Sequence, residues 1–420
     1  MSSSPQSLRA WTESFAPLRH RDFAWYLASR SVTLLGTTMA SVALAFAVLD
    51  LTGSTTALGQ VLAARTVPLI LVLLFGGVVA DRLPRSLVLQ GANLASAATQ
   101  GATAVLLLTG HARLWSLVVL QGLGGLASGL EFPAMAGMVP TLVPRGHLQR
   151  ANALVSMSRG LSAVLGPSLG ALAVVTVGSG WAVLIDAATW VGAALLLLPV
   201  RRAATLREPA PGGASVVTEL RQGWALFRGT TWLWVVVGAF GVLNGIGSGA
   251  WLTLGPSVAS RTIGRQAWGW VLSAESVGVL LATVLLLRLP LTRPLRVGML
   301  AVSALGVPIA LLGLHPRTGI LLASSFLGGV GVEIFGIGWN LAVQEHIEES
   351  QLSRAYSYDA LGSYAAMPLG QLTFGPLGEH FGNGQVVAVS GLVYVAVALS
   401  VLASRSVRDL GRAPATTATG

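Results

Sequence analysis

Among the few ionisable side chains inside long apolar stretches of the sequence, five are candidates for proton coupling or substrate binding. They are Arg30, Glu131, Arg159, Glu275 and Glu333. An unpaired charge near the centre of an apolar helix costs about 2.5–3.5 kcal/mol on insertion into a bilayer. Each of these groups is therefore expected to face a cavity, a partner of opposite charge or a proton route.

Three of the five lie at one common depth. Arg30, Glu131 and Arg159 each stand about eight residues from the end of their apolar stretch that is predicted to be cytoplasmic, which is about 12 Å at about 1.5 Å per helical residue. The spacing predicts a buried cluster that binds an anionic group, carries a proton on Glu131 or holds the N-terminal half together. Glu333, near the middle of its stretch, is a second candidate for proton or cation coupling.

Aromatic residues and amides also occur deep in the apolar stretches, at Asn244, Trp251, Trp339 and Asn340. An aromatic face beside polar amides suits a bulky amphipathic ligand, and helix packing is the alternative. The six histidines fall at the ends of stretches, and there is no cysteine. The sequence therefore predicts no metal site.

Composition places the chain in a bilayer. Of its 420 residues, 53% are hydrophobic and 10% are charged, whereas a soluble domain carries about a quarter charged residues. All 26 basic residues are arginines, and they occupy short gaps between apolar stretches. This distribution argues against a nucleic-acid partner, which would need a basic stripe or tail.

The pattern predicts an all-α membrane protein with twelve transmembrane helices in two pseudo-symmetric six-helix bundles, since a span needs about 20 apolar residues. The predicted spans are 23–48, 57–80, 87–109, 114–138, 151–176, 181–200, 231–255, 267–287, 297–314, 318–343, 355–378 and 385–403. The predicted divisions are an N-terminal tail 1–22, bundles 23–200 and 231–403, a central loop 201–230 and a C-terminal tail 404–420.

The arginines also predict the orientation. With the N-terminus inside, cytoplasmic segments hold 19 arginines and outer loops hold four, which is a strong positive-inside bias. Both termini are thus expected in the cytoplasm, and no removable signal peptide is expected. The predicted location is the inner (cytoplasmic) membrane of the cell.

The two halves resemble each other in sequence. The stretch GQVLAARTV from Gly59 matches GWVLSAESV from Gly269, and Arg82-x-x-Arg85 matches Arg293-x-x-Arg296 at nearly the same offset. Repeats in one orientation predict two parallel bundles about an axis normal to the membrane. Glu275 takes the repeat position of Arg65, although no direct bridge between these two is expected.

Two motifs carry a resemblance to the major facilitator superfamily. The first is Gly77-x-x-x-Asp81-Arg82-x-x-Arg85 between the second and third spans, and the second is Gly166-Pro167-x-x-Gly170 in the fifth. Shorter stretches, such as Ser357 to Gly362, are similar to the branch that exports macrolides and siderophores such as enterobactin. The resemblance covers residues 20 to 403.

The resemblance implies a role for each motif. The first motif would form a cytoplasmic gate with Asp81 at a helix N-terminus, and a plain positive-inside turn is the alternative. Its twin, Arg293 to Arg296, has Thr292 in place of the acid. The second motif is similar to that of the family's antiporters, and close helix packing is the alternative.

The predicted function is secondary active export of a hydrophobic or amphipathic small molecule by alternating access, driven by proton antiport and by no cofactor. An uptake transporter for a small organic solute is the nearest alternative. A membrane enzyme or a substrate-sensing receptor is a more distant one, because no catalytic constellation and no long signalling domain is found. The expected partners are the small molecule, protons and the lipid bilayer, and the expected state is a monomer.

Overall fold

The architecture is helical throughout the part of the chain that is described. A computed structural model describes residues 15–75, 85–136, 138–200, 224–286, 288–289, 291–348 and 351–412. All regular elements in these ranges are helices and none is a strand, which confirms the predicted fold class. The chain divides into two compact units, of which the first is 1–53 with 64–209 and the second is 54–63 with 210–420.

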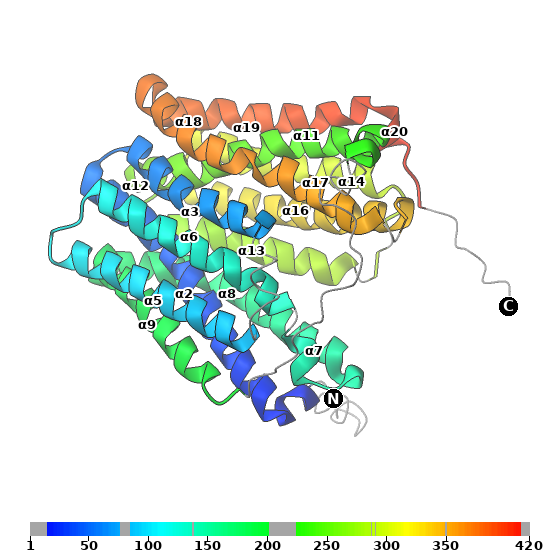
Figure 1. Ribbon diagram of the computed structural model, residues 1–420. Helices are drawn as coiled ribbons and strands as arrows, with labels where there is room; N and C mark the ends of the chain where they lie inside the picture. Colours follow the sequence, from blue (N-terminus) through cyan, green and yellow to red (C-terminus); the bar gives the residue numbers. More distant parts are fainter. Residues whose placement is uncertain are drawn as a thin grey trace, which may run out of the picture. The chain divides into compact units, whose positions relative to one another are not determined.

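The first unit is built mainly from long helices. Its elements are η1 (Ala16–Arg19), α2 (Arg21–Thr52), most of α3 (Thr55–Phe75), α5 (Arg85–Leu108), α6 (Leu114–Ala136), α7 (Val139–Leu142), η2 (Arg145–His147), α8 (Leu148–Val177) and α9 (Ser179–Leu197). Helix α2 packs against α8 and α9, and α5 packs against α6 and α9 (Figure 1). The start of α3, up to Ala63, groups with the second unit.

The second unit contains more interrupted helices. Its elements are α11 (Thr231–Ile246), η3 (Gly247–Leu254), α12 (Gly255–Arg261), α13 (Arg265–Leu286), α14 (Pro294–Val302), η4 (Ser303–Leu305), α15 (Gly306–Leu314), α16 (Thr318–His346), α17 (Leu352–Tyr364), α18 (Ala366–Phe381), α19 (Asn383–Ser400), η6 (Val401–Ala403) and α20 (Arg405–Arg408). Helix α16 packs against α13 and α14, while α18 packs against η3 and α11.

Ten helices in the described ranges are long and apolar enough to cross a membrane. Two of the twelve predicted spans are outside this set for different reasons. Helix α5 covers the span 87–109, but it buries polar side chains such as Asn93, Thr99 and Gln100. The span 355–378 is divided between α17 and α18. The twelve-helix count therefore rests on helical segments at all twelve predicted positions, ten of which meet the length and hydropathy limits.

The interruption between α17 and α18 has a local cause. Pro368 has no backbone N–H and cannot hydrogen-bond the carbonyl of Tyr364, four residues earlier, and its ring crowds that carbonyl. The α-helical pattern accordingly stops at Tyr364 and resumes at Ala366. Helix α11 and the following segment η3 supply donors near the break, from Asn244 Nδ2 of α11 to the Ser363 carbonyl at 3.0 Å and from Ser248 Oγ of η3 to the Met367 carbonyl at 2.9 Å.

A π-helical segment, η3, continues α11 into α12. Thr253 donates its hydroxyl to the carbonyl of Ser248, five residues earlier, at 2.8 Å, which matches the wider π turn. Pro256 follows and lacks the N–H that would continue regular α pairing. Segments of this kind occur frequently at functional sites because they displace side chains around the helix.

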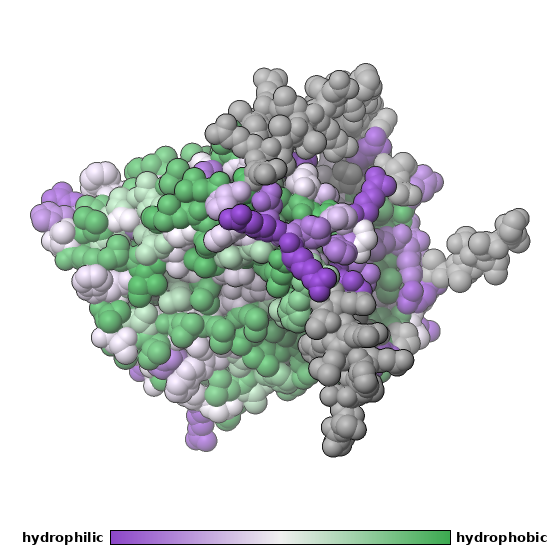
Figure 2. All heavy atoms as spheres, turned by 90° about the horizontal axis from the view of Figure 1, so that it is seen from below, coloured by the Kyte–Doolittle hydropathy of each residue, from purple (hydrophilic) through white to green (hydrophobic). Residues whose placement is uncertain are grey.

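The outer flanks of the helices are apolar. Large aliphatic side chains such as Leu94, Leu195, Val284 and Leu327 are more than half exposed. Figure 2 shows hydrophobic side chains over much of the visible face, most densely on the left, with hydrophilic ones gathered mainly toward the centre and right. Lipid is the medium that such a surface requires, since apolar patches this extensive are unfavourable in water.

Candidate functional site

Helices α2 and α6 bring Arg30 and Glu131 together in the first unit. An Arg30 guanidinium nitrogen, Nη1, donates to Glu131 Oε1 to form an ion pair. The two side chains are only 14% and 9% exposed, respectively. Each charge therefore depends on the other, because a buried charge without a partner is strongly unfavourable. A proton on Glu131 would remove the counter-ion of Arg30.

Of the three residues predicted to form a cluster, Arg30 and Glu131 form this ion pair and Arg159 is not part of it. Arg159 is exposed on α8, and it lies within electrostatic range of the Tyr26 hydroxyl, as Arg30 and Glu131 also do. Tyr26 is buried on α2 at 3% exposure. It belongs to the site although sequence analysis did not single it out, and its position one helical turn before Arg30 was an available signal.

A second polar group lies deeper in the same unit. Arg65 donates to Gln121 Oε1 at 3.4 Å, and Gln121 donates in turn to Gln100 Oε1 at 3.2 Å. Arg65 is also in electrostatic range of Asp186 and Glu131. Arg65 therefore interacts electrostatically with two buried acids of this unit, Asp186 and Glu131.

Asp186 is almost completely buried on α9, at 1% exposure. Neither of its carboxylate oxygens accepts a hydrogen bond of ordinary geometry from the described residues. A Cβ atom added to Gly36 of α2 would come within 2.8 Å of Asp186 Oδ1. Because Gly36 has no side chain, Asp186 fits into the interface between α2 and α9.

Helices α11, α16 and α17 enclose a cavity of about 180 Å³ in the second unit, here called the aromatic pocket. Its lining residues are Val236, Phe240, Asn244, Phe335, Trp339, Asp359, Ser363 and Tyr364. Three of the rings form a continuous wall. Phe240 and Phe335 stack with centroids 4.0 Å apart, and Phe335 and Trp339 stack at 6.1 Å.

Asp359 is the acid of the aromatic pocket. Its Oδ2 accepts a hydrogen bond from Trp339 Nε1 at 3.0 Å, and its Oδ1 accepts one from Ser363 Oγ at 3.0 Å. Both donors are neutral, so the carboxylate is oriented without being neutralised by an arginine. Ser363 and Tyr364, the last two residues of α17 before the break at Ala365, line the same cavity as Asp359.

The four residues expected to form a substrate cavity divide into two groups. Asn244 and Trp339 line the aromatic pocket. Trp251 instead donates to Glu275 Oε2 at 3.2 Å and packs edge-on against Trp268. Asn340 accepts a hydrogen bond from the Tyr356 hydroxyl at 3.1 Å, on an exposed part of α16.

The two acids predicted for coupling in the second unit both have neutral partners. Glu275 on α13 accepts a hydrogen bond from the indole N–H of Trp251, which belongs to the π-helical segment η3. Glu333 on α16 accepts a hydrogen bond from the Thr283 hydroxyl of α13 at 2.8 Å. Neither acid lines the aromatic pocket.

The motif in α8 makes a close helix contact. A Cβ atom at Gly166 would lie 1.9 Å from Thr38 Oγ1, and one at Gly170 would lie 2.5 Å from the Met39 carbonyl oxygen. Pro167 is between them inside the helix. The glycines allow α8 to approach α2, as small residues do in membrane helix pairs. The antiport role of the motif stays a prediction.

The predicted gate motif lies largely outside the described residues. Gly77, Asp81 and Arg82 belong to the stretch 76–84. Arg85 is described, at the first position of α5. The gate therefore stays a prediction.

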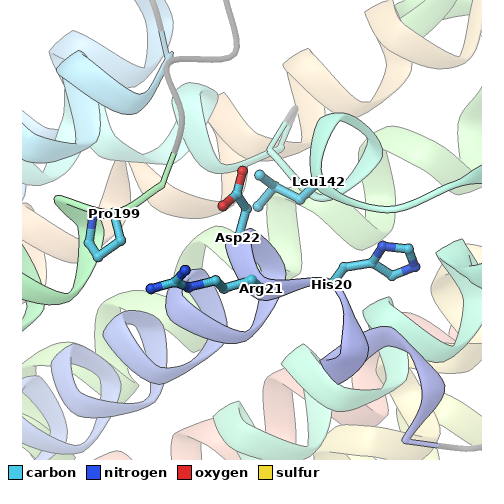
Figure 3. Close-up of a pocket in the computed structure, with 5 residues that line it drawn as sticks. All are labelled: His20, Arg21, Asp22, Leu142 and Pro199. Carbon is cyan, nitrogen blue, oxygen red and sulfur yellow. The ribbon is translucent and has the colours of Figure 1, made fainter.

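A second cavity, of about 450 Å³, lies at the start of α2 and is lined by His20, Arg21, Asp22, Leu142 and Pro199. Figure 3 shows the His20 ring pointing away from Asp22. This ring meets His147, with Nε2 and Nδ1 3.1 Å apart. The cavity is outside the predicted span 23–48, so we assign it no part in the substrate site.

Glu379, beyond the predicted span 355–378, caps the start of α3 within the second unit. Its carboxylate accepts hydrogen bonds from the Ser54 hydroxyl at 2.6 Å, the Thr56 amide at 3.0 Å and the Thr56 hydroxyl at 2.8 Å. Partial desolvation raises the pKa of Glu379, but these hydrogen bonds outweigh it and the pKa falls below its usual value. An anion at a helix N-terminus is also favoured by the helix dipole.

Comparison with known proteins now identifies the family. The Major Facilitator Superfamily model matches residues 27–370. The chain belongs to the Major Facilitator Superfamily. It is therefore a multi-pass membrane transporter of small molecules rather than an enzyme. Among the described residues, no group of three or more His, Asp or Glu side chains could hold a metal ion.

Two relatives in this superfamily are efflux proteins. The multidrug efflux pump Tap of Mycolicibacterium fortuitum is 28% identical over 356 residues, which cover 81% of this chain and 85% of Tap. The enterobactin exporter EntS of Escherichia coli O1:K1 / APEC is 26% identical over 356 residues, which cover 82% and 80%.

Solved structures of the superfamily share the fold at lower identity. The nucleoside transporter NupG superposes with a TM-score of 0.71 at 16% identity, covering 90% of this chain and 98% of NupG. A bacterial homologue of the human lysosomal transporter Spinster gives 0.69 at 14% identity, covering 95% of this chain and all of that one (100%).

Proposed function

We propose that this transporter exports a hydrophobic or amphipathic small molecule from the cytoplasm by proton antiport with alternating access. Tap and EntS are an efflux pump and an exporter by name, which supports the direction. The antiporter-like motif at Gly166, Pro167 and Gly170 supports exchange. We place the protein in the inner membrane with both termini in the cytoplasm, because of its arginine distribution, and we expect it to be a monomer.

The observation that carries the proton claim is the buried Arg30–Glu131 ion pair. The carboxylate that loses its charge on protonation is also the counter-ion of a buried arginine. Protonation of Glu131 would leave Arg30 in need of another anion or of water, so the contact between α2 and α6 has two different energies in the two protonation states. A transporter can couple proton entry to a conformational change in this way.

Glu275 and Glu333 are the alternative proton carriers. Each is half-buried and hydrogen-bonded by a neutral donor. Their protonation would not leave a neighbouring cation unpaired in the contacts described here. We therefore rank Glu131 first. For Arg159 we propose only an electrostatic effect on the site, through Tyr26. For Asn340 we propose no direct contact with the substrate.

Transport into inverted membrane vesicles tests the proposal. A pH gradient is imposed, and uptake of a panel of antibiotics and siderophores is compared for the unmodified protein and for Glu131→Gln. We expect gradient-dependent accumulation that Glu131→Gln abolishes at normal expression. Accumulation that survives collapse of the gradient would contradict proton coupling. Gradient-driven loss of substrate from the vesicles would favour the uptake alternative.

A further inference from the structure

The aromatic pocket combines a carboxylate with a wall of three aromatic rings. Asp359 and the rings of Phe240, Phe335 and Trp339 all line the cavity. All of these groups belong to the second unit. The pocket is thus a complete structural feature of that unit.

No cation of the protein neutralises Asp359 in the contacts of the described chain. Its hydrogen-bond donors are the Trp339 indole and the Ser363 hydroxyl. Two other acids offer a contrast, because Glu131 is paired with Arg30 and Glu345 is paired with Arg412. A partly buried carboxylate without a counter-ion attracts a cation from elsewhere.

The rings around the pocket favour the same kind of ligand. The face of an aromatic ring carries negative electrostatic potential, so that organic ammonium groups bind among aromatic side chains. Phe240 and Phe335 stack 4.0 Å apart, and Trp339 continues the stack. The rings also exclude water, which strengthens the attraction between a bound cation and Asp359. An anionic ligand would meet repulsion from the same carboxylate.

The cavity is small for a whole drug-sized molecule. Its volume is about 180 Å³, whereas pockets for drug-sized ligands have about 300–1,000 Å³. This volume suits one charged head group with a single aromatic ring attached. Tyr364 lines the same cavity and is 47% exposed, so it forms an open side from which the rest of a ligand can extend.

We propose that the aromatic pocket is a subsite for organic cations, in which Asp359 and the Phe240–Phe335–Trp339 wall bind the positively charged, aromatic end of an amphipathic substrate. The inference rests on the proposed transport function. It narrows the substrate class to cationic amphiphiles and places siderophore-type anions outside this subsite.

A pair of isosteric ligands tests the subsite. The probes are 3-hydroxyphenyltrimethylammonium, which is a cation, and 3-tert-butylphenol, which has the same shape without the charge. Affinities are measured by ligand-detected NMR titration of the full chain in detergent, with no proton gradient. We expect the cation to bind about tenfold more tightly than the neutral isostere. Equal affinities for the two ligands would overturn the proposal.

Two variants locate the binding. Asp359→Asn keeps the shape of the side chain and should reduce the affinity for the cation about tenfold while leaving the neutral isostere unchanged. Asp409→Asn makes the same change at a side chain that is 55% exposed, and it should change neither affinity. Unchanged cation affinity in Asp359→Asn would contradict the subsite.

If Asp359→Asn loses both ligands because the pocket is damaged, Phe240→Leu is the deciding variant, because Phe240 is an end ring of the stack whereas Phe335 is its middle ring. Leucine keeps apolar volume but removes the ring face, so a selective loss of cation binding is expected. Equal changes for both ligands would overturn the proposal. Because binding is measured without a gradient, failure of export in vesicles and failure of cation binding are separate results.

Discussion

Two carboxylates, one in each unit of this transporter, have partners of opposite kinds. In the first unit, Glu131 is matched by Arg30. In the second unit, Asp359 is held by the neutral donors Trp339 and Ser363 and faces an aromatic pocket. The first arrangement is internally neutral, and the second leaves a net charge available to a ligand.

This difference suggests a division of labour. An internally neutral pair responds to a proton, because protonating Glu131 creates an uncompensated Arg30. An uncompensated acid beside aromatic rings responds to an organic cation. We therefore assign proton coupling to the first unit and substrate charge recognition to the second. Two predictions test this assignment, and two more extend the comparison to the loop motif and to an exposed acid.

The largest expected effect comes from breaking the ion pair on one side. Arg30→Met or Glu131→Met should each destabilise the folded chain by about 3–5 kcal/mol, because each leaves a buried charge alone. The double variant should recover most of that loss. Unfolding in mixed micelles measures the double-mutant cycle, and single variants that cost less than about 1 kcal/mol would show that water already solvates the pair.

A substitution can give Asp359 a cationic partner within the protein, as Arg30 is for Glu131. Asn244 lines the same pocket, so the ammonium of Asn244→Lys is expected to pair with Asp359. Affinity for 3-hydroxyphenyltrimethylammonium should then fall by about tenfold or more. Asn244→Leu removes the same amide without adding charge and serves as the control. Full cation affinity in Asn244→Lys would contradict the role of Asp359.

The predicted gate extends the comparison to the loops. The motif in the first half has an acid, Asp81, whereas the matching position in the second half is Thr292. If the acid binds the amides of a helix N-terminus, Asp81→Asn should lower the rate of export severalfold, by the loss of an interaction of about 1 kcal/mol. Thr292→Ala should have little effect. Equal export rates in the two variants would reduce the motif to a plain turn.

The smallest effect is expected at Glu379, which is largely exposed. Its pKa is lowered when the chain is folded, since the hydrogen bonds from Ser54 and Thr56 outweigh the opposing effect of desolvation. Its stabilising contribution is therefore complete above the ordinary glutamate pKa of about 4.3 and is lost as pH falls through the lower folded value.

Glu379→Gln should accordingly lower stability by no more than about 1 kcal/mol at pH 7, given the solvent screening at this site. Thermal unfolding in detergent at pH 7 and at about pH 3 measures the change. The difference from the unmodified protein should shrink at the lower pH. Glu348→Gln, at an exposed position after α16, is the control. A difference that grows as the pH falls would contradict the capping role.

The sequence by itself determined the class of the protein. Apolar stretches of about 20 residues must lie in lipid, and the motifs at Asp81 and Gly166 indicated the superfamily. It also indicated that Arg30 and Glu131 need partners, because the cost of a lone charge in a membrane follows from composition and depth alone.

Tertiary structure decided which groups meet. Helix packing pairs Arg30 with Glu131 and leaves Arg159 exposed, which equal depth along three helices could not distinguish. The aromatic pocket needs Phe240, Phe335 and Asp359, which come from α11, α16 and α17, and the end of α17 adds Ser363 and Tyr364 to the same lining. Sequence spacing sets a residue's depth along its own helix, whereas the rotation and contacts of neighbouring helices set which side chains share a cavity.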